Sequence, residues 1–185
     1  MERLAQHVIF PAGPADAAAL GEVHVRAWRE TYAGLLPQAY LSAMNPDIHA
    51  ARWRRQLSRE ADGAPGGEVV LAVEGVRGLV GYCAGSLLKG AGKLADAEVF
   101  TLYLLKGAKG RGLGARLLGG MASALAAQGA TSLVVWVLSD NTAARGFYAH
   151  LGGRVLGERP VRGWGGGLKE TAYRWDDIAR LVAER

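Results

Sequence analysis

The 185 residues, 50% hydrophobic and 21% charged, have the composition of an ordinary globular protein with enough apolar residues for one sizeable core, so we expect one domain over residues 1–185. The first residues hold no apolar run of signal-peptide length, and no stretch of about 18 apolar residues occurs, which predicts a cytoplasmic protein without a membrane segment. A single cysteine, Cys83, excludes an intrachain disulfide, and no Cys/His cluster has metal-ligand spacing, so no metal is expected.

The net charge of +5 is unevenly distributed. The first 92 residues hold 9 of the 22 Lys and Arg residues and 9 of the 17 Asp and Glu residues, so the whole positive excess lies in the second half. A basic half indicates an anionic partner, which is either nucleic acid or a phosphorylated small molecule.

In the first half of the chain, residues 8–10 are predicted as a short strand, and Asp16 is placed to cap a helix that runs to about Tyr32. Two short helices and a hairpin of two antiparallel strands are expected next, at residues 37–41, 48–59, 69–74 and 79–88.

The second half is predicted as a strand, a helix, an apolar strand, a second helix and two final strands, at residues 97–105, 113–129, 132–138, 141–151, 154–159 and 170–175. Its first strand, helix and strand make a parallel crossover, whereas the earlier hairpin is antiparallel. The expected fold class is therefore mixed α/β (α+β), with helices on both faces of one sheet. Such a fold does not by itself specify a function.

The segment from Lys109 to Ala115 reads Lys-Gly-Arg-Gly-Leu-Gly-Ala between a strand and an amphipathic helix. Glycines let the backbone approach a ligand closely, and the N–H groups and dipole of a helix start attract an anion, above all a pyrophosphate. Lys106, Arg111 and Arg116 add positive charge nearby. The alternative without a function is a glycine-rich turn with solvated lysines.

Gly110 to Ala115 also satisfies the dinucleotide pattern G-x-G-x-x-A, and Asp140 follows the next strand as a candidate ribose ligand. Against a dinucleotide site, residues 106–109 separate the strand from the glycines, and too few residues follow Ala115 for the rest of a doubly wound sheet. No Walker lysine follows the last glycine, which argues against a P-loop.

The same segment resembles the acyl-CoA signature (Q/R)-x-x-G-x-(G/A) of the GNAT superfamily, with Lys109 in the first position and Gly112 and Gly114 as the glycines. The resemblance implies the GNAT fold, a central mixed, mostly antiparallel sheet of roughly six or seven strands flanked by helices. It also implies two sets of backbone groups that bind acetyl-CoA. The pantetheine arm would pair with Leu102, Tyr103 and Leu104. The pyrophosphate would be held by Lys109, Gly110, Arg111, Gly112, Leu113, Gly114 and Ala115.

A longer match follows, because family members commonly read N-x-x-A-x-x-F-Y-x-x-x-G where this chain has Asn141, Ala144, Phe147, Tyr148 and Gly152. In the family this tyrosine is often the general acid that protonates the departing thiolate, and a phenol has the required donor. We expect Phe147 to point to the core and Tyr148 to reach the edge of the cleft from the helix surface. Asn141 is expected either to bind the cofactor or to cap the helix.

Glu98 lies eleven residues before Lys109, the interval that separates the general-base glutamate from the signature in the family's histone acetyltransferases. An amine is protonated at neutral pH and must lose a proton before it attacks a thioester, which a carboxylate can accept directly or through water. The equal alternative is a structural Glu98.

The stretch from Trp28 to Pro37 resembles the first helix and loop of many bacterial GNAT enzymes, which wall the acceptor site. Trp28 and Tyr32 are therefore candidate substrate-binding residues, although an aromatic pair at helical spacing also suits a core. Residues 163–167, a glycine-rich stretch with one tryptophan, are a candidate rim of that site or a plain hairpin tip.

The function expected from the resemblance is direct transfer of an acetyl group from acetyl-CoA to a primary amine, small or on a peptide, with Tyr148 and Glu98 as catalytic residues. A homodimer is common in the family. Three alternatives stay open: a non-catalytic GNAT-fold regulator that binds acyl-CoA, a basic nucleic-acid-binding module, for which no reading helix or aromatic sheet motif is present, and a dinucleotide oxidoreductase. No nucleic acid or membrane partner is expected.

Overall fold

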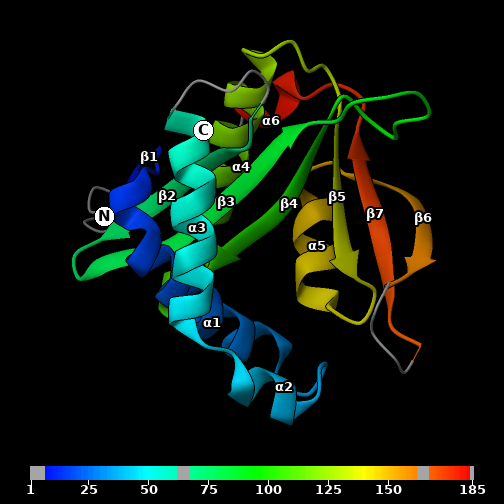
Figure 1. The fold of residues 1–185 in the computed structure, drawn as a ribbon. Helices are drawn as coiled ribbons and strands as arrows, with labels where there is room; N and C mark the ends of the chain where they lie inside the picture. The colour runs from blue at the N-terminus through cyan, green and yellow to red at the C-terminus, as the bar shows by residue number, and fades with distance from the viewer. Residues whose placement is uncertain (1–6, 62–66, 162–166, 184–185) are drawn as a thin grey trace.

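The computed structural model describes residues 7–61, 67–161 and 167–183. Within these ranges seven strands form one sheet in the order β1-β2-β3-β4-β5-β7-β6 (Figure 1). The strands are β1 Val8–Pro11, β2 Val69–Gly75, β3 Gly78–Leu87, β4 Ala97–Leu104, β5 Leu133–Leu138, β6 Arg154–Pro160 and β7 Lys169–Trp175. The helices are α1 Ala17–Tyr32, α2 Gln38–Ala43, α3 Pro46–Ala61, α4 Leu113–Ala126, α5 Thr142–His150 and α6 Ala179–Ala183.

The sheet has the mixed, mostly antiparallel topology that the sequence predicts. β4 and β5 run parallel on either side of the α4 crossover, and the other neighbouring strands pair antiparallel. Every expected strand and helix is present with small shifts at its ends, whereas α6 was not predicted. No helix in the described ranges combines the length and hydrophobicity needed to cross a bilayer.

Helices α1, α2 and α3 cover one face of the sheet (Figure 1). Leu20 and Ala27 of α1 and Trp53 of α3 are buried with Tyr82 of β3 in one cluster. α1 and α3 pack so closely that a Cβ atom on Gly21 would lie 2.5 Å from the carbonyl oxygen of Pro46. Glycine at this position is therefore what allows α1 to reach the start of α3.

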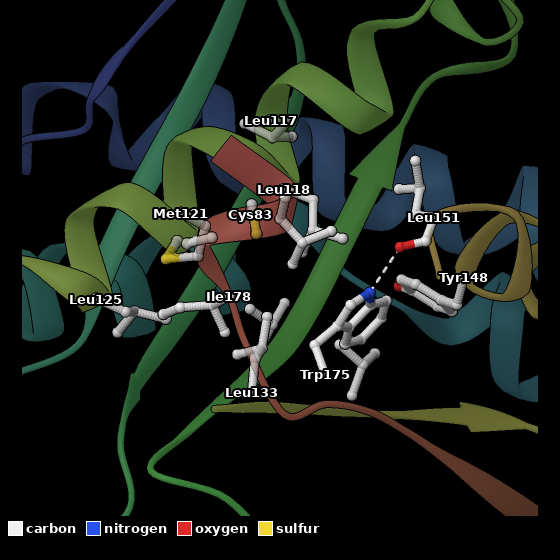
Figure 2. Packing of buried hydrophobic residues seen from close by; sticks show 14 of the residues in the cluster. Cys83, Leu117, Leu118, Met121, Leu125, Leu133, Tyr148, Leu151, Trp175 and Ile178 are labelled. Atoms are coloured by element: carbon white, nitrogen blue, oxygen red, sulfur yellow. Dashed lines mark hydrogen bonds between the residues drawn. The ribbon is translucent and has the colours of Figure 1, made fainter. Parts of the chain in front are cut away.

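Helices α4, α5 and α6 pack on the opposite face and form the larger core cluster. Figure 2 shows side chains of α4 packed against strand residues and Ile178, with Cys83 of β3 among them. Cys83 is fully buried, and burial raises the pKa of its thiol. Cys83 is therefore a small buried residue and not a reactive thiol.

Asp16 caps a different turn from the one predicted. Its carboxylate accepts a hydrogen bond from the backbone N–H of Gly13 at 2.8 Å, across the 3-10 turn Pro14–Asp16 that precedes α1. The side chain makes no capping bond to α1 itself. A short turn inserted before the helix thus uses the carboxylate that the sequence assigned to α1.

Candidate active site

The strands β4 and β5 diverge shortly after they begin. Their parallel pairing covers only Ala97–Val99 against Leu133–Val135. β4 continues to Leu104 with β3 as its partner, so its backbone groups on the β5 side have no strand partner there. An extended ligand can pair with such an edge as an added strand.

A cavity of about 590 Å³ occupies the region of divergence, a volume typical of small-molecule sites. It reaches from the end of α1, across β4 and β5, to the glycine turn and α5. The predicted site residues that line it are Tyr32, Leu102, Tyr103, Leu104, Lys109, Gly110, Gly112, Gly114, Ala115, Asn141 and Tyr148. The predicted residues outside its lining are Trp28, Glu98, Arg111 and Leu113.

The glycine turn at one end of the cavity has the backbone conformation that glycine favours. Gly110 and Gly112 have φ of +71° and +73°, and Gly112 is the N-cap residue of α4. Gly114 is required for another reason, since a Cβ atom there would meet the ring of Phe147 at 3.1 Å. The turn therefore leaves the first N–H groups of the fourteen-residue α4 open toward the cavity, where they favour an anion.

Polar contacts join the glycine turn to the end of α1. The backbone N–H of Lys106 donates to Glu30 Oε2 at 2.6 Å, and Lys109 Nζ donates to Thr31 Oγ1 at 3.3 Å. Thr31 and Lys109 both line the cavity. α1 and the turn are thus held together around one end of it.

Asn141 acts as a helix cap. Its Oδ1 accepts a hydrogen bond from the backbone N–H of Ala144 at 3.1 Å, and the residue is buried at the N-terminus of α5. Asn141 also lines the cavity. Of the two roles that the sequence left open, the structure shows the cap, and the contact with a ligand remains a prediction.

Tyr148 lies deeper than predicted. It is 6% exposed and packs against Tyr173 and Trp175 at ring-centroid distances of 5.9 and 6.1 Å (Figure 2). Phe147, expected to be the core residue, is only half-buried and packs on Gly114. The expectation that Tyr148 lies on the helix surface was therefore wrong, because α5 turns Ala144 and Tyr148 toward the sheet.

The burial of Tyr148 suits a proton donor. Tyr148 lines the cavity from within, and its hydroxyl makes no hydrogen bond to any described residue. Burial, followed by the nearby Cys83 and Tyr32, raises the pKa of Tyr148. The phenol therefore keeps its proton at neutral pH.

Tyr32 reaches the cavity from α1, whereas Trp28 stands behind it. The hydroxyl groups of Tyr32 and Tyr103 are 2.9 Å apart, and the Trp28 ring packs edge-on to Tyr32 with centroids 4.9 Å apart. The buried indole N–H of Trp28 has no hydrogen-bond partner among the described residues. Tyr32 is thus a wall of the cavity, and Trp28 supports it.

The contacts of His24 with Tyr82 and His49 were not predicted from the sequence. His24 Nδ1 lies 2.6 Å from the hydroxyl of Tyr82, and its ring stacks on His49 at 4.1 Å between centroids. Burial, then the positive charges of His49 and Arg52, lowers the pKa of His24 to about 3. His24 therefore stays neutral, and the tautomer of its ring decides whether Nδ1 accepts the Tyr82 proton or donates to the Tyr82 oxygen.

Glu98 stands on β4, half-buried and outside the cavity lining. Burial raises the pKa of its carboxyl group, the charge of Arg159 lowers it, and the charge of Glu170 raises it. Phe100, Thr101 and Trp136 line the cavity instead, none of which the sequence singled out. A role for Glu98 as base thus requires a water between carboxylate and amine.

The described residues include no group of His, Cys, Asp and Glu side chains that could hold a metal ion. The predicted glycine-rich rim at residues 163–167 lies, except for Gly167, outside the residues that the structure describes.

Comparisons with known proteins agree with this geometry. Residues 76–161 match the family model described as FR47-like protein. The chain is 28% identical over 166 residues to the uncharacterized N-acetyltransferase YuaI of Bacillus subtilis (strain 168), covering 90% of this chain and 91% of that protein.

Solved structures share the fold. The PaiA N-acetyltransferase of Thermoplasma acidophilum, in complex with coenzyme A, superposes with a TM-score of 0.73 at 18% identity, covering 91% of this chain and 99% of that one. YncA of Salmonella typhimurium, with its cofactor acetyl-CoA, has a TM-score of 0.64 at 24% identity and covers 93% and 94%. The ribosomal-protein-alanine N-acetyltransferase of Brucella melitensis has a TM-score of 0.69 at 21% identity and covers 91% and 98%.

In sequence and fold the chain is similar to N-acetyltransferases of the GNAT superfamily.

Proposed function

We propose that this N-acetyltransferase binds acetyl-CoA in the cavity between β4 and β5 and transfers the acetyl group directly to a primary amine. The observation that carries the proposal is the cavity itself, which runs from the N-terminus of α4 to Tyr32 and Trp136. Coenzyme A in the PaiA structure and acetyl-CoA in the YncA structure support this choice of co-substrate.

In this proposal the two ends of acetyl-CoA meet different parts of the chain. The pyrophosphate lies on the N–H groups from Lys109 to Ala115, where the start of α4 and the lysine favour negative charge. The pantetheine arm pairs with the free edge of β4 at Leu102, Tyr103 and Leu104. Main-chain groups make both sets of contacts, so lysine in the first signature position is compatible with binding.

The transfer forms one bond and breaks another. The amine nitrogen attacks the thioester carbonyl carbon, N–H groups of β4 near Leu102 to Leu104 stabilise the oxyanion, and the C–S bond then breaks. Tyr148 donates its proton to the departing sulfur. The proton lost by the amine passes through water to Glu98 and from there to solvent, and the phenolate of Tyr148 is reprotonated from solvent.

The burial of Tyr148 is consistent with proton transfer to sulfur. A phenol with a raised pKa is a weak acid toward a thiolate in water. The same apolar cavity also raises the pKa of the thiol that forms there, because burial disfavours a thiolate. Burial therefore shifts the pKa values of the phenol and of the thiol in the same direction.

Thermal unfolding with candidate co-substrates tests the binding half of the proposal. Acetyl-CoA at a hundred times its Kd is expected to stabilise the chain by about 2.7 kcal/mol, and NADH to have no effect. Stabilisation by NADH alone would support the dinucleotide alternative and contradict the proposal. Stabilisation by acetyl-CoA without acetylation of any amine in a broad panel would support the alternative of a non-catalytic regulator that binds acyl-CoA.

We further propose a cytoplasmic location, because the reaction consumes acetyl-CoA. The family resemblance also predicts a homodimer. Sedimentation equilibrium tests it, with a single species of twice the chain mass as the expected result.

A further inference from the structure

Trp136 connects the cavity to the sheet face covered by α1 and α2. It lines the cavity and lies two residues from Leu138, which packs against α1 and α2 on that face. Alternate residues of a strand share a face, so Trp136 presents its ring on the same side as Tyr32. Tyr32 and Trp136 thus both border the cavity on this face of the sheet.

A positive charge already rests on Trp136. The guanidinium carbon of Arg159 lies 3.7 Å from the centroid of the Trp136 ring, and Arg159 Nε donates to Glu170 Oε1 at 2.5 Å. The strand order produces this contact, since Arg159 pairs with Glu170 across β6 and β7, and β7 lies beside β5. The aromatic face and the carboxylate together form a cation-binding pair.

Two carboxylates and one guanidinium interact beside the ring. The charges of both Arg159 and Glu170 act on the carboxyl group of Glu98, so the three side chains form one electrostatic group. It holds two carboxylates against one guanidinium. A ligand that brings a further positive charge is favoured here, and one that brings a carboxylate is opposed.

Arg159 is the more exposed partner of its ion pair with Glu170. Its side chain is 52% exposed and belongs to β6, which is exposed along its whole length at the edge of the sheet. The Glu170 side chain is only 19% exposed, so it stays against the sheet when the arginine moves. An ion pair with one exposed partner costs little to exchange for another of the same kind.

We propose that Trp136 and Glu170, with Glu98 beside them, form an acceptor subsite for a second positively charged group, and that Arg159 stands in for this group in the free enzyme. The acceptor is therefore a dicationic amine. One amino group is acetylated at the thioester while the other lies on the Trp136 ring and Glu170. This inference rests on the proposed acetyl transfer and specifies its substrate class.

Steady-state acetylation of a matched set of amines tests the inference. The set contains α,ω-diamines of increasing length, the monoamines of equal length, and ω-amino acids with a carboxylate in place of the second amine. We expect kcat/KM for the best diamine to exceed that of its monoamine by about tenfold, and the amino acid to be the poorest acceptor.

Variants assign the preference to the subsite. Glu170→Gln and Trp136→Leu are expected to reduce the ratio of kcat/KM for the diamine to kcat/KM for its monoamine to about onefold to threefold. Glu158→Gln is the matched control, because Glu158 lies on the same hairpin but bonds with Ser139 and Thr171. Arg159→Gln is expected to lower KM for diamines, since it removes the guanidinium that occupies the subsite in the free enzyme.

Equal kcat/KM for diamine and monoamine, or a preference for the amino acid, overturns the subsite and leaves acetyl transfer intact. A higher KM for diamines in Arg159→Gln contradicts the proposal that Arg159 occupies the site of the second amino group in the free enzyme. Acetylation of none of these amines, together with no stabilisation by acetyl-CoA, contradicts the proposed function itself.

Discussion

Gly114 and Phe147 meet where α4 and α5 approach each other at the cavity. A Cβ atom on Gly114 would lie 3.1 Å from two carbon atoms of the Phe147 ring. Glycine thus lets the ring close over the start of α4, where the pyrophosphate of the co-substrate is proposed to bind. The sequence signature and the adjoining helix are in this way parts of one site.

Gly114→Ala should displace Phe147 and destabilise the chain by about 1–3 kcal/mol, the cost of overpacking. Isothermal titration should show weaker binding of acetyl-CoA, because the ring borders the cavity. Gly146→Ala is the control, since a Cβ atom there meets nothing within 4 Å. Equal binding by both variants would exclude a role for this contact.

Gly112→Ala should cost roughly 1–2 kcal/mol of stability, because Gly112 has φ of +73° and an L-residue is strained there. The backbone N–H groups that follow should also move away from the anion, which weakens acetyl-CoA binding. Gly107→Ala provides the comparison, since Gly107 has ordinary φ and open space for a Cβ. Binding that is unchanged in Gly112→Ala would place the pyrophosphate elsewhere.

Tyr148→Phe should lower kcat by about a hundredfold or more and leave stability nearly unchanged. The hydroxyl makes no hydrogen bond to the described residues, so its removal orphans no partner there. Rapid-quench measurement of acetyl-amine formation separates this step from product release. A normal rate in the variant would remove Tyr148 from the chemical step.

The pH dependence of kcat/KM tests Glu98. Burial raises the pKa of Glu98, Arg159 lowers it and Glu170 raises it. If Glu98 accepts the amine proton, activity requires its carboxylate and falls as the pH drops through this pKa. Arg159→Gln should move the acidic limb to higher pH and Glu170→Gln to lower pH, and the limb should be absent in Glu98→Gln. If none of these variants moves the acidic limb of the pH profile, a group other than Glu98 accepts the proton of the amine.

The lowered pKa of buried His24 predicts that acid destabilises the folded chain. An unfolded chain protonates this histidine near pH 6.5, whereas the folded chain holds it neutral down to about pH 3. Acid therefore favours the unfolded state in this window, by up to about 1.4 kcal/mol per pH unit. His24→Asn, which keeps a hydrogen-bonding partner for Tyr82, should flatten the fall of Tm with pH, while exposed His150→Asn should not. Parallel curves for all three proteins would contradict this assignment.

Features encoded by local sequence were predicted well. Periodicity located the helices and strands, and glycines at positive φ marked the turn before α4, because both signals arise from neighbouring residues. The burial of Tyr148 was missed, since the angle between adjacent helix residues does not say which one faces the sheet. The Arg159, Glu170 and Trp136 group was missed because it depends on β7 lying between β5 and β6.

The position of Glu98 shows that spacing in the sequence does not by itself assign a catalytic role. The interval to Lys109 matches the family pattern, yet Glu98 lies outside the lining of the cavity. Its electrostatic partners come from β6 and β7, more than fifty residues later in the chain. The spacing of residues along one strand predicts neither the charged partners of Glu98 nor whether water reaches its carboxyl group.

An assay that follows both products of one reaction tests the central claim most directly. Enzyme, acetyl-CoA and a diamine are mixed, and the free thiol of CoA and the singly acetylated diamine are measured together. We expect the two products to form in equal amounts, and the rates of both to fall by about a hundredfold or more in Tyr148→Phe. Thiol release without acetylated amine, or no release with any amine, would contradict acetyl transfer by this site.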